Sequence, residues 1–105
     1  MGKILIIGAS ILQLPAILKA KEAGYYTIVT DMNPNAMGIA YADKFYPVNT
    51  IDEERTAALA EKIRPDGIMT LATDLPMRSL AVATSRIGLP GIRYYRRSPT
   101  QRFRN

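Results

Sequence analysis

A glycine turn stands eight residues into the chain, between an apolar run and a helix-like segment. The run is Lys3–Ile7, and Gly8, Ala9 and Ser10 follow it directly. Glycine lets a backbone turn tightly and approach a ligand, and the amide groups at the start of a helix attract anions. Ser10 adds a hydroxyl group, and Gln13 adds a side-chain amide one turn later. We therefore expect this turn to contribute to a binding site for a small anion.

Polar residues also follow two other expected strands. Asp31 and Asn33 come at the end of the second strand, and Thr73 and Asp74 come at the end of the fourth. In a parallel sheet, ligands collect at the carboxyl ends of the strands, so we expect these loops to meet the Gly8 turn at one pocket. Simpler structural roles stay open for each residue taken alone. Asp74, for example, is a good N-cap for the helix behind it.

The turn departs from the known phosphate-binding motifs. Of the three glycines of G-x-G-x-x-G, only Gly8 is kept, and Ser10 in place of the second glycine would crowd a pyrophosphate. Asp31 lies about 20 residues further on, near the spacing of a ribose-binding acid, so dinucleotide binding stays an alternative. A P-loop is excluded because no G-x-x-x-x-G-K-[ST] is present. A response-regulator receiver would need an acidic pair where Gly8 and Ala9 stand.

The hydrophobic pattern predicts the elements that must position these loops. Pro47 cannot donate to a ladder, so the third strand is expected at an edge, and a capping box at Thr50–Glu53 is expected to start the second helix. The order β-α-β-β-α-β-α-β favours a doubly wound α/β fold with a mostly parallel sheet of four to five strands. The expected strands are 3–7, 25–31, 45–48, 67–73 and a short 89–92, and the expected helices are 10–23, 50–64 and 75–87.

The first helix has an unusually wide apolar surface. Leu14 and Leu18 fall opposite the side that faces the sheet, beside charged residues, which indicates either a wider buried face or a contact surface for another domain or subunit. The residues expected to face the sheet are Leu12, Ala16, Ile17, Ala20 and Ala23.

Composition limits the function classes. The chain has 105 residues, which fits one domain at 1–92 followed by an irregular basic tail at 93–105. Cysteine and histidine are absent, which excludes disulfides and thiolate metal sites and removes the commonest general base. The net charge of +5 comes from five arginines in the tail, so nucleic-acid binding is not favoured. No apolar run is long enough for a membrane span, and we expect a cytoplasmic protein.

Three stretches resemble the N-terminal, pre-ATP-grasp domain of ATP-grasp ligases, and most closely the branch related to the large subunit of carbamoyl-phosphate synthase. The most specific likeness is Leu-Gln-Leu-Pro-Ala at 12–16, paired with Asp-Met-Asn-Pro-Asn-Ala at 31–36 and Tyr-Ala-Asp-Lys-Phe at 41–45. The stretches are 3–25, 29–52 and 65–92, so the likeness covers most of the chain.

This resemblance implies a Rossmann-like domain that helps to bind a carboxylate or amine substrate. In this family ATP phosphorylates a carboxylate and an amine attacks the acyl phosphate, while later domains hold ATP and magnesium. No catalytic residue or metal ligand is implied within this chain. The residues implied in substrate contact, by their positions in the motifs, are Gly8, Ala9, Ser10, Gln13, Asp31, Asn33, Thr73 and Asp74.

The chain also departs from the family pattern. Family members often carry a second glycine where Ser10 stands, and they continue into an ATP-grasp domain where this chain ends. We therefore expect the chain alone not to catalyse ligation, and we expect an ATP-grasp domain to be its partner. Two alternatives stay open: a non-catalytic module that self-associates into a homo-oligomer through Leu14, Leu18 and the tail, and a dinucleotide-binding regulator.

Overall fold

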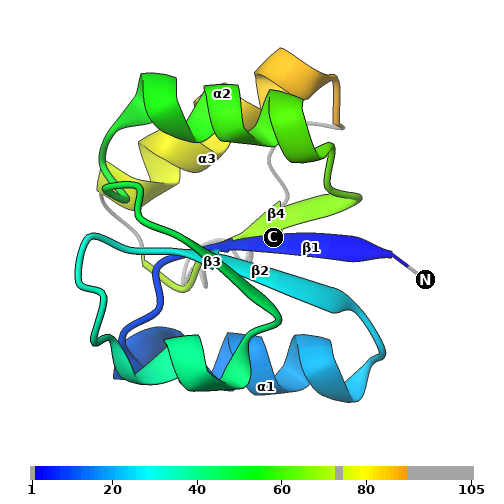
Figure 1. Cartoon of the computed structure of the whole chain (residues 1–105). Helices are drawn as coiled ribbons and strands as arrows, with labels where there is room; N and C mark the ends of the chain where they lie inside the picture. The colour runs from blue at the N-terminus through cyan, green and yellow to red at the C-terminus, as the bar shows by residue number, and fades with distance from the viewer. Residues whose placement is uncertain (1, 73–74, 90–105) are drawn as a thin grey trace, which may run out of the picture.

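The computed structural model describes residues 2–72 and 75–89 of the chain. Its sheet has four strands, all parallel, in the order β3-β2-β1-β4. Helix α1 covers one face of the sheet and helices α2 and α3 cover the other (Figure 1). The predicted α/β class with a parallel sheet is therefore confirmed. The strands are β1 (Lys3–Ile7), β2 (Tyr26–Thr30), β3 (Lys44–Tyr46) and β4 (Gly67–Met69). The helices are α1 (Leu14–Glu22), α2 (Glu53–Ile63) and α3 (Leu75–Ile87), with 3₁₀ turns η1 (Ile11–Gln13) and η2 (Met37–Tyr41).

Strand β1 lies between β2 and β4 and organises the sheet. Ile6 pairs with Val29 on one side and with Met69 on the other. Because all strands run in the same direction, the loops that follow β1, β2 and β4 leave from one edge, called here the carboxyl edge. The amide of Gly8 donates to the carbonyl of Thr30 at 2.9 Å, which continues the pairing into the first loop.

The core lies on both faces of the sheet because neighbouring residues of a strand point to opposite sides. Ile6 belongs to the cluster beneath α1, together with Ile17 and Val29. Leu5 belongs to the cluster on the other face, where it packs with Leu59 of α2. This arrangement explains the continuous apolar run of β1, since a strand buried on both faces needs no polar alternation.

The start of the first helix differs from the prediction. The chain makes the 3₁₀ turn η1 before α1 begins, and a 3₁₀ turn has three residues per turn instead of 3.6. This different number of residues per turn rotates the side chains around the helix axis. Leu12 is therefore 75% exposed, and the prediction that it faces the sheet was wrong. Gln13 is buried in its place, with 5% of its surface exposed. Ala23 is also exposed, at the C-cap of α1. Leu18 points outward as predicted, with 45% of its surface exposed.

Other helix and strand boundaries differ from the predicted ones, each because of a local contact or residue. Helix α2 is capped by Asp52, whose carboxylate accepts from the amide of Arg55 at 3.0 Å, and not by Thr50 as expected. Strand β3 lies at an edge, as predicted from Pro47, and ends just before that proline. Strand β4 is shorter than predicted because Thr70 turns its hydroxyl to the carbonyl of Ile7 at 2.8 Å. Residues 90–92 of the expected fifth strand and the tail 93–105 lie outside the described residues.

Asp43 fastens α1 to the sheet at the end opposite the carboxyl edge. Its carboxylate accepts from the ammonium of Lys21 at 2.7 Å and from the amide of Thr27 at 2.8 Å. The hydrogen bond from Lys21, and then that from Thr27, lower the pKa of Asp43 below its ordinary value. The folded state thus favours the ionised form more than the unfolded state does, so this stabilisation is present above the unfolded pKa and is lost as pH falls through the lower folded pKa.

We expect Asp43→Asn to lower the free energy of unfolding by about 1 kcal/mol at pH 7, because the exposed ion pair is lost while the amide can still accept from Thr27. The difference between the variant and the natural chain should begin to shrink as pH falls below the ordinary Asp pKa of about 4, and it should vanish only below the lower pKa of the folded state. Urea unfolding at several pH values measures this difference. Glu22→Gln is the control, since Glu22 meets Lys19 only at 3.8 Å on the surface. If the difference in free energy of unfolding between Asp43→Asn and the natural chain does not change with pH, the ionised Asp43 carboxylate is not the source of the stabilisation.

Candidate functional site

The Gly8 turn is hydrogen-bonded to the loop that follows β2. One carboxylate oxygen of Asp31 accepts from the amide of Ala9 at 2.9 Å, and the other accepts from the amide of Asn33 at 2.9 Å. Both oxygens of Asp31 therefore bind backbone amides. Asp31 holds the first and second loops of the carboxyl edge against each other.

Gln13 joins the same turn to the loop that follows β4. Its buried side chain accepts from the amide of Leu71 at 2.9 Å through Oε1. The hydroxyl of Thr70 supports this contact, since it donates to the carbonyl of Ile7 and accepts from the amide of Ala72 at 3.2 Å. The first of the three loops that were expected at one edge is thus hydrogen-bonded directly to both of the others.

Gly8 is required at the centre of this arrangement for two reasons. Its φ angle is +110°, a conformation that residues with a side chain rarely adopt. A Cβ atom at this position would also lie 2.9 Å from Cγ of Gln13. The glycine therefore both turns the chain and leaves room for the glutamine that ties the first loop to the third.

Gly38 supports the turn from the side of α1, and sequence reasoning missed it. Its amide donates to the carbonyl of Ala9 at 2.7 Å. A Cβ atom on Gly38 would lie 2.6 Å from that carbonyl oxygen and 2.5 Å from Cδ1 of Ile17. The sequence showed a glycine at the end of an expected loop, but nothing in the local pattern indicated that η2 packs directly on the first turn.

The turn contains backbone amides that no hydrogen bond among the described residues uses. Ser10 acts as the cap of η1: its hydroxyl accepts from the amide of Leu12 at 3.2 Å, and its carbonyl accepts from the amide of Gln13 at 2.8 Å. Within residues 2–72 and 75–89, no hydrogen bond uses the amides of Ser10 or Ile11. These two donors lie next to the Ala9 amide, which Asp31 already occupies.

The predicted site residues therefore fall into three groups. The structure brings together Gly8, Ala9, Ser10, Gln13 and Asp31. Asn33 lies exposed, further out on the second loop, where its side-chain oxygen accepts from the amide of Asn35 at 2.9 Å. Thr73 and Asp74 lie outside the described residues.

The acidic side chains of the described residues form no close cluster. Among them, no three Asp or Glu side chains gather closely enough to hold a metal ion, and each oxygen of Asp31 accepts from a backbone amide. No phosphoryl-transfer step is assigned to these residues. None of the described helices combines the length and the apolar character needed to cross a bilayer.

No family model matches the chain, and no curated protein matches it. Solved structures do match it, among them two ligase structures. Phosphoribosylglycinamide synthetase from Anaerococcus prevotii has 29% sequence identity and a TM-score of 0.77, over 86% of this chain and 23% of that one. N5-carboxyaminoimidazole ribonucleotide synthetase from Thermotoga maritima has 28% identity and a TM-score of 0.67, over 81% of this chain and 23% of that one. In its fold the chain resembles a pre-ATP-grasp domain.

The chain spans less than a quarter of the length of those two ligases. The more specific likeness to carbamoyl-phosphate synthase stays a prediction. UDP-glucose 4-epimerase from Thermotoga maritima is also similar, with a TM-score of 0.65 and 21% identity over 83% of this chain and 35% of that one. At that identity the likeness concerns the fold alone, so it adds no argument for dinucleotide binding.

Proposed function

We propose that this pre-ATP-grasp domain is the substrate-binding part of an ATP-dependent carboxylate–amine ligase, and that its Gly8 turn contacts an anionic group of the substrate. The observation that carries the proposal is the hydrogen-bonded meeting of three loops around this turn. Asp31 binds the turn on one side and Gln13 binds the Leu71 loop on the other. The likeness to two ligases supports the reaction class.

The turn suits an anion because its donors are fixed before a ligand arrives. Backbone N–H groups at such a turn favour carboxylates and phosphates, and the amides of Ser10 and Ile11 are the donors not used among the described residues. In this proposal Gly8, Ala9 and Ser10 approach the substrate, while Gln13 and Asp31 keep the turn in place. ATP and magnesium would be held by another domain of the full-length ligase.

An NMR titration of the whole chain tests the contact. Acetate, succinate, glycine and aspartate are added in turn at constant ionic strength, with ethylamine as a cation that lacks a carboxylate. We expect the amide signals of Ser10 and Ile11 to shift with a dissociation constant of about 1 mM for at least one carboxylate. Ethylamine alone should leave these signals unchanged.

Two substitutions of Ser10 separate its amide from its hydroxyl group. The φ angle of Ser10 is −71°, which proline can adopt, so Ser10→Pro removes the N–H donor and the hydroxyl together. Ser10→Ala removes the hydroxyl group alone. We expect Ser10→Pro to weaken binding of the carboxylate about tenfold relative to Ser10→Ala, with folding checked by circular dichroism. Equal affinities for the two variants, or shifts spread evenly over the domain, would count against the proposed site.

A further inference from the structure

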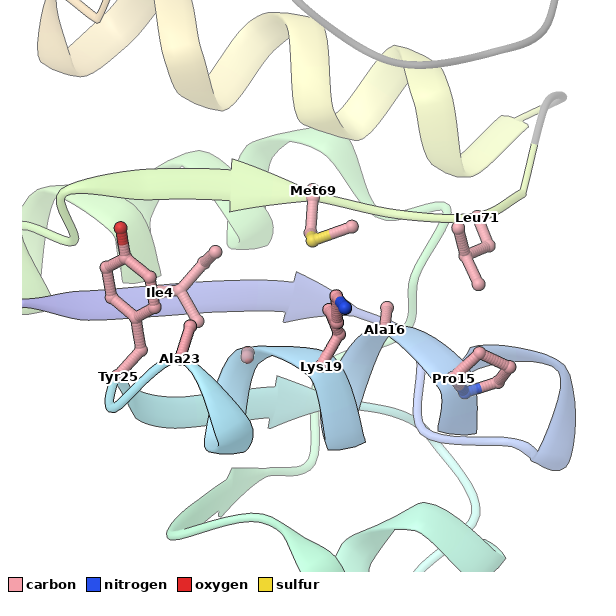
Figure 2. A pocket seen from close by; sticks show the side chains of 9 residues that line it. Ile4, Pro15, Ala16, Lys19, Ala23, Tyr25, Met69 and Leu71 are labelled. Atoms are coloured by element: carbon pink, nitrogen blue, oxygen red, sulfur yellow. The ribbon is translucent and has the colours of Figure 1, made fainter.

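The face of the sheet that carries α1 is covered unevenly. Helix α1 packs on β1 and β2, and η2 packs beside it, whereas β4 is contacted by α3 on the opposite face. A groove of about 480 Å³ therefore runs between α1 and the β1–β4 pair (Figure 2). Ile4 and Met69 form its floor, and Tyr25 and Leu71 lie at its two ends.

The lining of the groove is almost entirely apolar. A parallel sheet is normally covered on both faces, because its strands are apolar on both sides, and the opposite face is covered by α2 and α3 (Figure 1). Among residues 2–72 and 75–89, no helix covers this strip of the sheet, and 45% of Leu71 and 41% of Tyr25 are exposed at its ends. The strip is thus a surface that a further element would bury.

We propose that this groove binds an amphipathic α-helix of a partner polypeptide, which lies beside α1 with its apolar side on Ile4 and Met69. Among the residues that α1 and its C-cap contribute to the wall of the groove, three are alanines, Ala16, Ala20 and Ala23, spaced by four and three along one helical face. Such a wall lets a second helix approach to the usual interaxial distance of about 8–10 Å. Recognition then follows the helix-in-groove mode.

The charge of the groove specifies the partner further. Lys19 stands on the wall with 83% of its side chain exposed and meets Glu22 only at 3.8 Å. The partner helix therefore carries an acidic residue facing Lys19, together with leucine-like residues at i, i+3, i+4 and i+7. A basic segment such as 93–105, with its five arginines, does not match this charge. A helix of roughly three turns matches α1 in length.

The test is an NMR titration of the whole chain with a helix-stapled synthetic peptide of about 15 residues. The peptide contains leucine, alanine, glutamine and glutamate, with the leucines on one face and one glutamate beside them. We expect shifts at Ile4, Lys19, Met69 and Leu71 and none along α3, with a dissociation constant of about 100 μM. A control peptide has the same composition but distributes its leucines around the helix, and it should not bind.

A matched pair of charge reversals sharpens the result. Lys19→Glu should weaken binding of the amphipathic peptide about fivefold, the upper range for an exposed ion pair. Arg78→Glu makes the same change on α3, which covers the other face, and should leave the affinity unchanged. Both positions are exposed, so folding should persist in each variant, which circular dichroism verifies.

Three results would overturn the proposal: no shift at about 1 mM peptide, equal binding of the two peptides, or equal effects of the two reversals. Shifts at the groove that depend on protein concentration without any peptide would assign the groove to a second copy of the chain instead. The readout is independent of the proposed anion site, because carboxylates are followed at Ser10 and Ile11 and the peptide is followed at Ile4 and Met69.

Discussion

Gly8→Ala is expected to lower the free energy of unfolding by about 2–4 kcal/mol. Two effects add. The backbone at this position has a φ angle of +110°, which strains any residue with a side chain. The new Cβ atom would also stand 2.9 Å from Cγ of Gln13, which is only 5% exposed and is held in place by the amide of Leu71. Urea unfolding followed by circular dichroism measures the loss.

Gly24→Ala is the matched control for Gly8→Ala. Gly24 also has a positive φ angle, +90°, but no atom lies within 4 Å of the Cβ position. This variant therefore meets only the backbone strain, and we expect a loss of about 1 kcal/mol. If both variants lower the free energy of unfolding by the same amount, the packing of Gln13 against Gly8 does not contribute to the requirement for glycine at position 8.

A second substitution tests the role of Gln13 in the same turn. In the Gln13→Ala background the crowding atom is gone, so the added effect of Gly8→Ala should fall to that of Gly24→Ala. Gln13→Ala by itself should be costly, because the amide of Leu71 would lose its acceptor. A full additive loss in the double variant would show that the two residues act independently.

The architecture was predictable because it depends on local patterns. The apolar run of β1, the breaks at Gly8 and Gly24, and Pro47 beside an edge strand are all readable from the order of residues. Parallel strands then force the loops to one edge whatever the exact packing. For this reason the meeting of the loops after β1, β2 and β4 followed from the sequence even though several boundaries moved.

The contacts within the site were less predictable because they join residues far apart in the chain. Asp31 was expected to contact a substrate, which stays a prediction, and the sequence did not indicate that its carboxylate accepts from the amides of Ala9 and Asn33. Leu12 is exposed and Gln13 is buried because the chain forms the 3₁₀ turn η1 at these residues. Hydrophobic spacing does not distinguish such a turn from a regular helix. At α2, both Thr50 and Asp52 are good caps, and only the path of the chain from β3 selects Asp52.

Gly38→Ala is expected to lower the free energy of unfolding by about 3–5 kcal/mol, which is more than the loss expected for Gly8→Ala. The new Cβ atom would lie 2.6 Å from the carbonyl oxygen of Ala9 and 2.5 Å from Cδ1 of Ile17. Neither neighbour can move freely, since Ile17 is fully buried and the Ala9 carbonyl belongs to the Gly8 turn. η2 must shift away, which breaks its 2.7 Å hydrogen bond to Ala9. Chemical denaturation measures the loss, and the amide signals of Ala9 and Ser10 report the displaced turn.

Gly67→Ala provides the control for Gly38→Ala, because its Cβ atom would lie 3.9 Å from the side chain of Ile4, an ordinary contact. We expect this change to alter stability by no more than about 0.5 kcal/mol. Ile17→Val then separates the two clashes at Gly38, since it removes Cδ1 but leaves the Ala9 carbonyl. In that background Gly38→Ala should recover only part of its loss. Full recovery would mean that side-chain crowding alone requires glycine, and that η2 does not brace the backbone of the Gly8 turn.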